Sequence, residues 1–211
     1  MARNKEETKA RILAAVGKLL AESGFRELGI NAIAREANID KVLIYRYFDG
    51  LPSLLRIFGQ EGGYWPEMET LVGNEATAEA ESLADWMVKL LLGLLHELKE
   101  RPITQEIMRW ELLEGNELTH ELAKVREETA NASLDFLQRK STFPPNTDIP
   151  AVSAILVAGI VYLLLRSKAT HTFFGVDLQS PDGWMRIEEA AALMLQATIR
   201  HADSESECSL P

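Results

Sequence analysis

The chain has 211 residues, of which 46% are hydrophobic and 26% are charged, as in globular proteins that bury a core. This composition excludes whole-chain disorder, and the single cysteine, Cys208, excludes a disulfide framework and a cysteine-rich metal site. The charged N-terminus predicts no secretory signal, and the longest apolar run, residues 151–165, is shorter than the roughly 20 residues that span a membrane. We therefore expect a cytoplasmic protein of one or two domains that does not enter a membrane.

The net charge of −10 is unevenly distributed along the chain. Residues 1–56 hold ten Lys and Arg against seven Asp and Glu, whereas residues 57–211 hold twelve against twenty-five. Because nucleic acids repel an acidic surface, only the N-terminal part is suited to approach an anionic partner.

The N-terminal third shows helical periodicity. One apolar stripe runs from Ile12 to Leu20, and this helix is expected to end at Gly24, which can take the left-handed conformation that closes a helix. Gly29 and Asp40 are expected to cap the next two helices. The pattern predicts three further helices, at residues 30–37, 41–48 and 51–60.

The remaining residues predict five longer helices separated by prolines, glycines and polar breaks. Thr77 can cap the first, and Pro102, Pro150 and Pro181 stand where later helices begin. No alternating strand pattern is present, so the fold is predicted to be all-α with about nine helices. The polar, acidic residues 203–211 are expected to form a disordered tail. The five helices are predicted at residues 77–100, 102–113, 118–140, 150–172 and 181–202.

A helix-turn-helix is predicted at about residues 29–48. Asn38 stands at the tight turn, where a residue that tolerates positive φ is needed. Ile44 and Phe48 point inward from the second short helix, which leaves two cations, a tyrosine hydroxyl and a small apolar group outside. Such a helix can enter a DNA major groove. The outward residues are Lys41, Val42, Tyr45 and Arg46.

Several residues of this segment follow a specific spacing. They are Ile33, Ala34, Ala37, Ile39, Lys41, Tyr45 and Phe48, preceded by Gly24-Phe25 and followed by Leu54-Leu55. The pattern resembles the N-terminal helix-turn-helix of the TetR family of transcriptional regulators. The resemblance covers residues 5–58 by motif and the remainder by its run of helices and its length. It implies a three-helix DNA-binding domain at residues 1–50 and a C-terminal ligand-binding and dimerisation domain at residues 51–202.

The resemblance also implies a function. A protein of this type is expected to be a repressor that a small apolar ligand releases from a palindromic operator. The residues expected to contact DNA are Asn31, Lys41, Val42, Leu43, Tyr45, Arg46 and Tyr47.

Four positions depart from the family pattern. Gly29 and Leu43 stand where the family usually has threonine, Asn38 replaces a glycine, and Leu51 replaces a lysine. Individual phosphate contacts are lost, whereas the scaffold is kept. The departures leave open a helical ligand-binding or carrier protein without DNA binding, and a DNA binder that activates or takes no ligand is a further alternative.

The C-terminal helices carry large apolar side chains that suit either a plain core or a ligand chamber. The resemblance implies a chamber, and the acidic C-terminal part favours a neutral or cationic apolar effector. His96 and Thr104 are candidate polar groups. The residues expected to bind the ligand are Trp86, Leu90, Met108, Trp110, Phe136 and Tyr162.

Residues 151–165 are apolar on nearly all sides and must be covered by the chain's own domain and by a second subunit. The resemblance implies a homodimer with twofold symmetry, formed through residues about 151–171 and 183–199. Glu117 and His120 have the spacing of half of a di-iron motif, but no second such pair is present. We expect no cofactor, no metal and no enzymatic activity.

Overall fold

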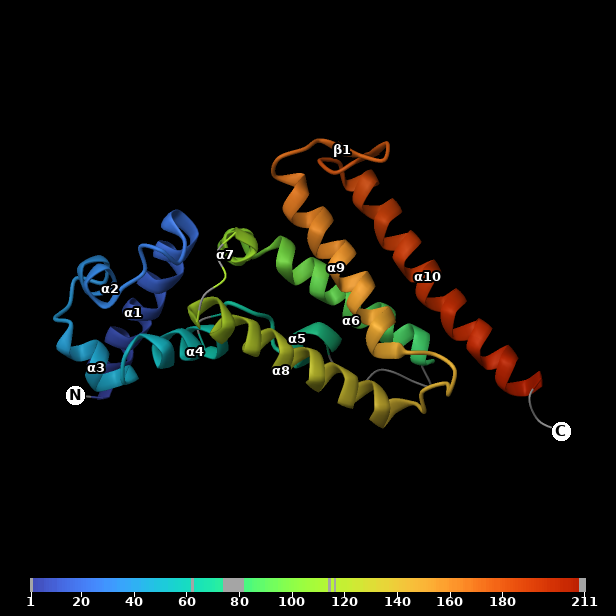
Figure 1. The fold of residues 1–211 in the computed structure, drawn as a ribbon, viewed down its shortest axis with the longest axis horizontal. Helices are drawn as coiled ribbons and strands as arrows, with labels where there is room; N and C mark the ends of the chain where they lie inside the picture. The colour runs from blue at the N-terminus through green and yellow to red at the C-terminus, as the bar shows by residue number, and fades with distance from the viewer. Residues whose placement is uncertain (1, 62, 74–81, 114, 116, 209–211) are drawn as a thin grey trace. The chain divides into compact units, whose positions relative to one another are not determined.

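The structure is a computed structural model that describes residues 2–61, 63–73, 82–113, 115 and 117–208. Within these ranges the regular secondary structure is helical apart from one short hairpin, which confirms the predicted all-α class (Figure 1). Packing divides the chain into two compact units. The first comprises the described residues up to Pro66 together with Glu100–Thr129, and the second comprises Glu67–Lys99 and the chain from Ala130 onward. The functional domains expected at 1–50 and 51–202 divide the chain differently and stay a prediction.

Each unit has its own set of helices. The first unit contains α1 (Ala2–Ser23), α2 (Ile30–Glu36), α3 (Val42–Phe48), α4 (Leu51–Glu61), α7 (Pro102–Leu113) and the first half of α8 (Glu117–Lys140). The second unit contains α5 (Met68–Val72), α6 (Leu83–Lys99), the second half of α8, α9 (Ile149–Ser167), β1 (Thr172–Phe173), β2 (Val176–Asp177) and α10 (Pro181–Cys208).

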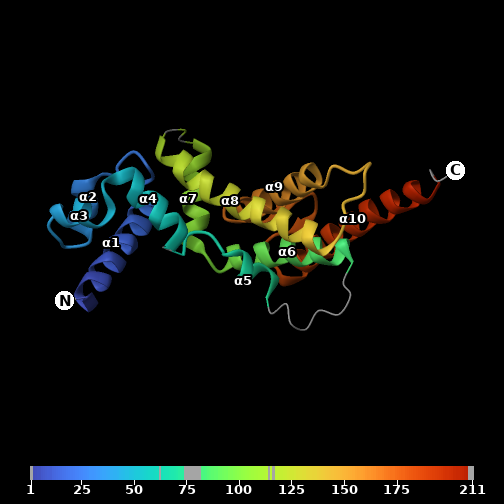
Figure 2. The ribbon, with the colours of Figure 1, turned by 90° about the horizontal axis from the view of Figure 1, so that it is seen from below.

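Helix α1 is the centre of the first unit, where it contacts α2, α4 and α7 (Figure 2). Its predicted stripe is fully buried at Ile12, Val16 and Leu20. Gly24 ends the helix with a φ of +70°, as expected, and a Cβ atom there would lie 2.8 Å from the Trp110 indole. Trp110 of α7 therefore packs directly on the end of α1 because this position has no side chain.

A buried polar network joins the segment after α4 to α7 and α8. Arg126 donates a hydrogen bond to the Tyr64 hydroxyl, which in turn donates to the carboxylate of Glu111 at 3.3 Å. Arg126 also forms an ion pair with Glu111 at 2.6 Å, and Thr104 donates to the carbonyl oxygen of Tyr64 at 2.6 Å. Thr104, a candidate ligand group, thus has a structural partner in the core.

Burial is the largest influence on the pKa values of Tyr64 and Glu111 in this network. It raises the pKa of the Tyr64 phenol, an effect that the neighbouring Arg126 opposes. Burial also raises the pKa of Glu111, again against the opposing effect of Arg126. The network therefore joins three parts of the first unit at the cost of desolvating ionisable groups.

Helix α6 is the centre of the second unit, where it contacts α5, α9 and α10. A Cβ atom at Gly93 would lie 2.5 Å from the carbonyl oxygen of Leu71, so α5 can lie this close only against glycine. Trp86 of α6 meets Phe136 of α8 edge-on, with 5.1 Å between the ring centroids. Glu188 of α10 accepts a hydrogen bond from Lys99 of α6 at 3.0 Å.

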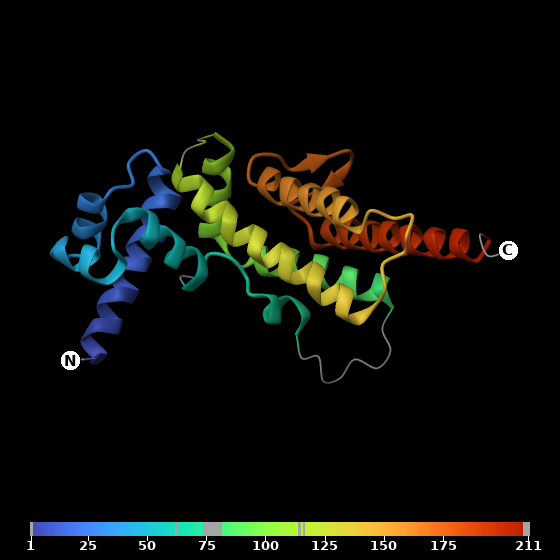
Figure 3. The same ribbon diagram turned by 60° about the horizontal axis from the view of Figure 1, so that its bottom comes forward.

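A hairpin connects α9 to α10 (Figure 3). Strands β1 and β2 pair in antiparallel register, with Phe173 opposite Val176. The two residues between them, Phe174 and Gly175, both have positive φ, which matches the right-handed twist of the strands. Phe174 is 93% exposed at the tip.

Several element boundaries differ from the sequence predictions. The predicted start at Thr77 lies outside the described residues, and in the described part α6 begins at Leu83. Ser82 accepts from the amide of Asp85 at 3.2 Å and donates its own amide to the Asp85 carboxylate, which is a capping box. Helix α9 ends at Ser167 rather than at residue 172, because the hairpin follows it. Helix α10 continues to Cys208, because residues 203–208 of the expected tail contain neither glycine nor proline.

Helix α9 is long and apolar enough to cross a membrane by length and composition, with a mean hydropathy of 2.1 over its most apolar window. Only 22% of that window is buried within the single chain. Its buried residues are Ile149, Ile160 and Leu164. One copy of the chain therefore buries only a small part of this window, and the expected cover by a second subunit stays a prediction.

We predict that Tyr64 makes the protein sensitive to alkali. In the unfolded chain the Tyr64 phenol ionises near pH 10, whereas the buried phenol keeps its proton, so the folded state binds more protons above this pH. The free energy of unfolding should therefore fall as the pH rises above about 10. In Tyr64→Phe this fall should be shallower, and at pH 7 the variant should lose about 1–2 kcal/mol because Arg126 and Glu111 lose a partner.

Denaturant unfolding measured between pH 7 and 11.5 tests this prediction. Tyr45→Phe is the matched control, because it removes an exposed phenol from α3. The wild type and Tyr45→Phe should show the same steep alkaline loss. An equally steep loss in Tyr64→Phe would show that another group causes it.

Candidate nucleic-acid interface

The turn between α2 and α3 is held by helix α1. Asn38 has a φ of +51°, as the sequence predicted for this turn. Arg11 donates hydrogen bonds to the carbonyl oxygens of Ala37 and Asn38, which satisfies acceptors at the end of α2. Lys18 forms an ion pair with Glu36 at 2.7 Å. Two cations of α1 therefore fix the end of α2 and the turn that follows it.

Helix α3 is anchored on its inner face and capped at both ends. Ile44 and Phe48 are buried, as expected. The Asp40 carboxylate accepts a hydrogen bond from the amide of Val42 at 2.9 Å, and Asp49 ends the helix with a φ of +57°. These contacts restrict rotation of α3 about its own axis, so the packing decides which residues of the helix face outward.

The outer face of α3 presents the residues expected to contact DNA. Val42, Tyr45 and Arg46 share one face at i, i+3 and i+4, and all three are exposed, with 61% of Val42 and 56% of Tyr45 accessible. Lys41 is exposed directly before the helix, and Asn31 is exposed on α2.

The two other residues expected to contact DNA lie at the margins of this face. Leu43 and Tyr47 are half-buried, and the ammonium of Lys5 lies 5.8 Å from the Tyr47 ring centroid. The complete arrangement offers cationic and hydroxyl donors for phosphates and an apolar group for bases.

The six residues expected to bind a ligand fall into both packing units. Met108 and Trp110 belong to the first unit, where Trp110 packs on Gly24 and donates its indole N–H to Ala21 at 3.4 Å. Trp86, Leu90 and Phe136 are buried in the second unit. Tyr162 is half-exposed on α9 and meets Phe173 of the hairpin at 5.7 Å between ring centroids. Their common role in a chamber stays a prediction.

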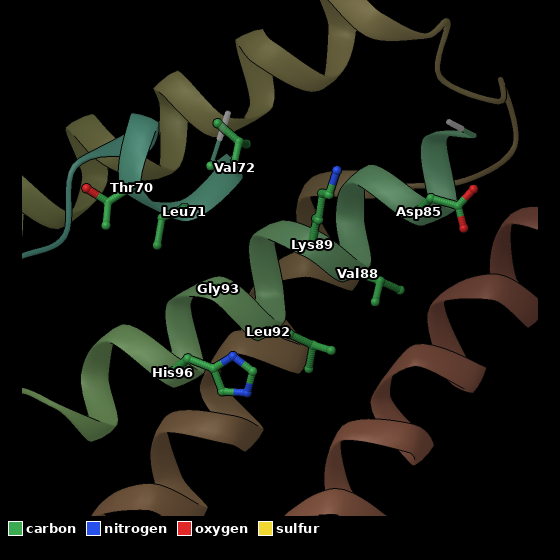
Figure 4. A pocket seen from close by; sticks show the side chains of 10 residues that line it. Thr70, Leu71, Val72, Asp85, Val88, Lys89, Leu92, Gly93 and His96 are labelled. Atoms are coloured by element: carbon green, nitrogen blue, oxygen red, sulfur yellow. The ribbon is translucent and has the colours of Figure 1, made fainter. Parts of the chain in front are cut away.

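A groove of about 590 Å³ lies between α5 and α6 in the second unit (Figure 4). None of the six expected ligand residues lines it. Its walls combine apolar side chains with the ammonium of Lys89 and the imidazole of His96, which sequence analysis named as a candidate polar group. His96 also lies 3.2 Å from Glu188 of α10. Apolar lining residues include Leu71, Val72, Val88 and Leu92.

Sequence periodicity did not reveal this groove. Helix α5 forms one of its walls, and that helix has only five residues, which is too short to give a periodic signal. The approach of α5 to α6 depends on Gly93, whose importance appears only in three dimensions.

Comparison with known protein families identifies the N-terminal segment. Residues 12–56 match the family model described as bacterial regulatory proteins, tetR family. These residues therefore belong to the TetR family. The matched range contains α2, the turn at Asn38 and the whole of α3, so this family assignment includes the exposed face described above.

Solved structures that include TetR-family regulators share the fold along nearly the whole chain. A TetR family transcription regulator from Marinobacter aquaeolei VT8 has a TM-score of 0.62 and 16% identity, and the match covers 94% of this chain and 98% of that one. GusR from Salmonella enterica has a TM-score of 0.63 and 16% identity, with coverage of 92% and 96%. The fatty acid degradation regulator FadR from Bacillus halodurans has a TM-score of 0.63 and 17% identity, with coverage of 89% and 94%. A comparison with curated protein sequences found no match.

The chain therefore has the TetR regulator fold, with a helix-turn-helix at its N-terminus and the fold of a TetR-type ligand-binding domain beyond it.

We predict that a hydroxyl at position 29 strengthens DNA binding. Gly29 precedes α2 with φ −156° and ψ 160° and makes no side-chain cap. Apart from its two chain neighbours, a Cβ atom there would meet no atom of the described residues within 4 Å. A threonine fits this extended backbone, and its hydroxyl can cap α2 or donate to a phosphate. Gly29→Thr should therefore bind a non-specific duplex more tightly at low salt.

Gly29→Val is the matched control, because valine has the shape of threonine without the hydroxyl. Fluorescence anisotropy with one labelled duplex compares the three proteins. If threonine and valine bind equally, the missing hydroxyl has no part in the interface.

Proposed function

We propose that the protein is a homodimeric repressor that binds a palindromic operator through α3 and is released by a small effector. The observation that carries this proposal is the exposed face of Val42, Tyr45 and Arg46, on a helix whose opposite face is locked into a TetR-type DNA-binding domain. The expected contacts extend to Lys41, Leu43, Tyr47 and Asn31. As a DNA-binding regulator, the protein would act in the cytoplasm, without a cofactor.

The proposed dimer face lies on α9 and α10. On α9 the exposed residues at helical spacing are small or apolar, including Ile155, Gly159 and Tyr162. On α10, Leu193 and Met194 are also exposed. Apolar helix surfaces of this kind are covered in stable proteins, and a second copy related by a twofold axis covers both at once. The proposed face comprises residues about 151–171 and 183–199.

The proposed effector is a small apolar molecule, neutral or cationic, because residues 57–211 are strongly acidic. The buried pair of Trp86 and Phe136 and the groove between α5 and α6 lie in the second unit, which makes this unit the proposed ligand-binding part. A molecule is identified as the effector if it binds this unit and lowers the affinity of the protein for operator DNA. Such a ligand must bind the conformation that does not bind DNA more tightly than the conformation that does.

We predict that Lys41 and Arg46 supply phosphate contacts. The double variant Lys41→Ala/Arg46→Ala should bind an operator, selected from random DNA with the wild type, roughly tenfold or more weakly at low salt. Each lost phosphate contact should also reduce the slope of log affinity against log salt by about 0.9. Anisotropy titrations at several salt concentrations measure both effects.

Lys124→Ala/Arg139→Ala is the control, since it removes two exposed cations from α8 and changes the net charge equally. The control should keep the affinity and slope of the wild type. Failure of the wild type to select any DNA would instead favour a carrier without DNA binding.

We predict that Gly159→Glu separates the dimer without unfolding the chain. Apart from its two chain neighbours and the backbone of its own helix, a Cβ atom at Gly159 would meet no atom of the described residues within 4 Å, so the single chain has room for the side chain. In the proposed dimer the glutamate would enter an apolar contact near its symmetry mate, which is strongly unfavourable. Sedimentation at micromolar concentration should show a monomer whose circular dichroism remains helical.

Gln138→Glu adds the same charge at an exposed position of α8 and should leave the dimer intact. A Gly159→Glu protein that still sediments as a dimer would place the interface on another surface.

A further inference from the structure

Val42 is the most exposed apolar side chain of the helix-turn-helix. It occupies the first turn of α3, with 61% of its surface accessible. The inner face of the same helix is filled by Ile44 and Phe48, so Val42 adds nothing to that core. Its backbone amide is already bonded to Asp40, which fixes where the side chain stands.

Val42 lies at the N-terminal end of α3, the part of a recognition helix that contacts bases in other helix-turn-helix proteins. In helix-turn-helix proteins the N-terminal residues of the recognition helix contact the bases, whereas the flanks of the helix meet the backbone. Tyr45 and Arg46 follow one turn later on the same face, and their longer side chains with polar ends suit phosphates as well as bases.

The chemistry of α3 restricts which base edges it can read. Residues 41–48 contain no Asp, Glu, Asn or Gln, and therefore no carboxylate or amide oxygen to accept from the amino groups of cytosine or adenine. The nearest carboxylate, that of Asp40, already accepts the amide of Val42. An isopropyl group can recognise only one feature of the major groove, the methyl group of thymine.

We propose that Val42 reads a thymine methyl group in each operator half-site and is the specificity-determining apolar residue of α3. The proposal rests on the proposed function as a DNA-binding regulator. It deepens that function by naming a chemical group that the operator must carry. Loss of one buried methyl contact is expected to weaken binding roughly three- to tenfold.

Replacement of thymine by uracil tests the proposal, because uracil lacks only the methyl group. Operator sequences are first selected from random DNA with the full-length wild type. Each thymine of the selected half-site is then replaced by uracil, one position at a time, and affinity is measured for the wild type and for Val42→Ala. Circular dichroism and binding to non-specific DNA verify that Val42→Ala is folded.

The expected result is one position per half-site where uracil weakens the wild type roughly three- to tenfold and leaves Val42→Ala unaffected. If no thymine is sensitive, or if Val42→Ala loses as much as the wild type, Val42 does not read a methyl group. If no sequence is enriched at all, the proposed DNA-binding function itself fails, which is a distinct outcome.

Discussion

The burial of one apolar stripe on α1 is the constraint on which the first unit depends. Ile12, Val16 and Leu20 are completely buried, and their helix contacts α2, α4 and α7. Arg11 and Lys18 of the same helix bond to α2 and to the turn that follows it. The direction in which α3 points is therefore a consequence of hydrophobic burial on a different helix.

Glycines determine how closely the neighbouring helices pack within each unit. In the first unit a Cβ atom at Gly59 would lie 2.7 Å from a methyl group of Val125, which joins α4 to α8. In the second unit Gly93 gives α5 the same access to α6. Both glycines lie inside helices, where they lower intrinsic helix stability, so close packing must compensate for that loss.

The sequence predicted the helix-turn-helix closely because its signals are local. Asn38 at the turn, Asp40 at the cap and the inward Ile44 and Phe48 all act within a few residues of each other, and each was confirmed. The expected ligand residues depend on contacts between distant helices, which periodicity cannot supply. The hairpin between α9 and α10 was missed for a related reason, since strands of two residues are too short to show alternation.

The tip of that hairpin carries an amino acid that folding alone does not favour. Both turn residues have positive φ, a geometry in which asparagine followed by glycine is strongly preferred. The chain has phenylalanine there instead, with its ring in water and 5.0 Å from that of Phe173. Exchange of Phe174 for asparagine is therefore expected to stabilise the turn and to make the single chain less prone to aggregate. The stability of the turn does not explain why phenylalanine stands at this position.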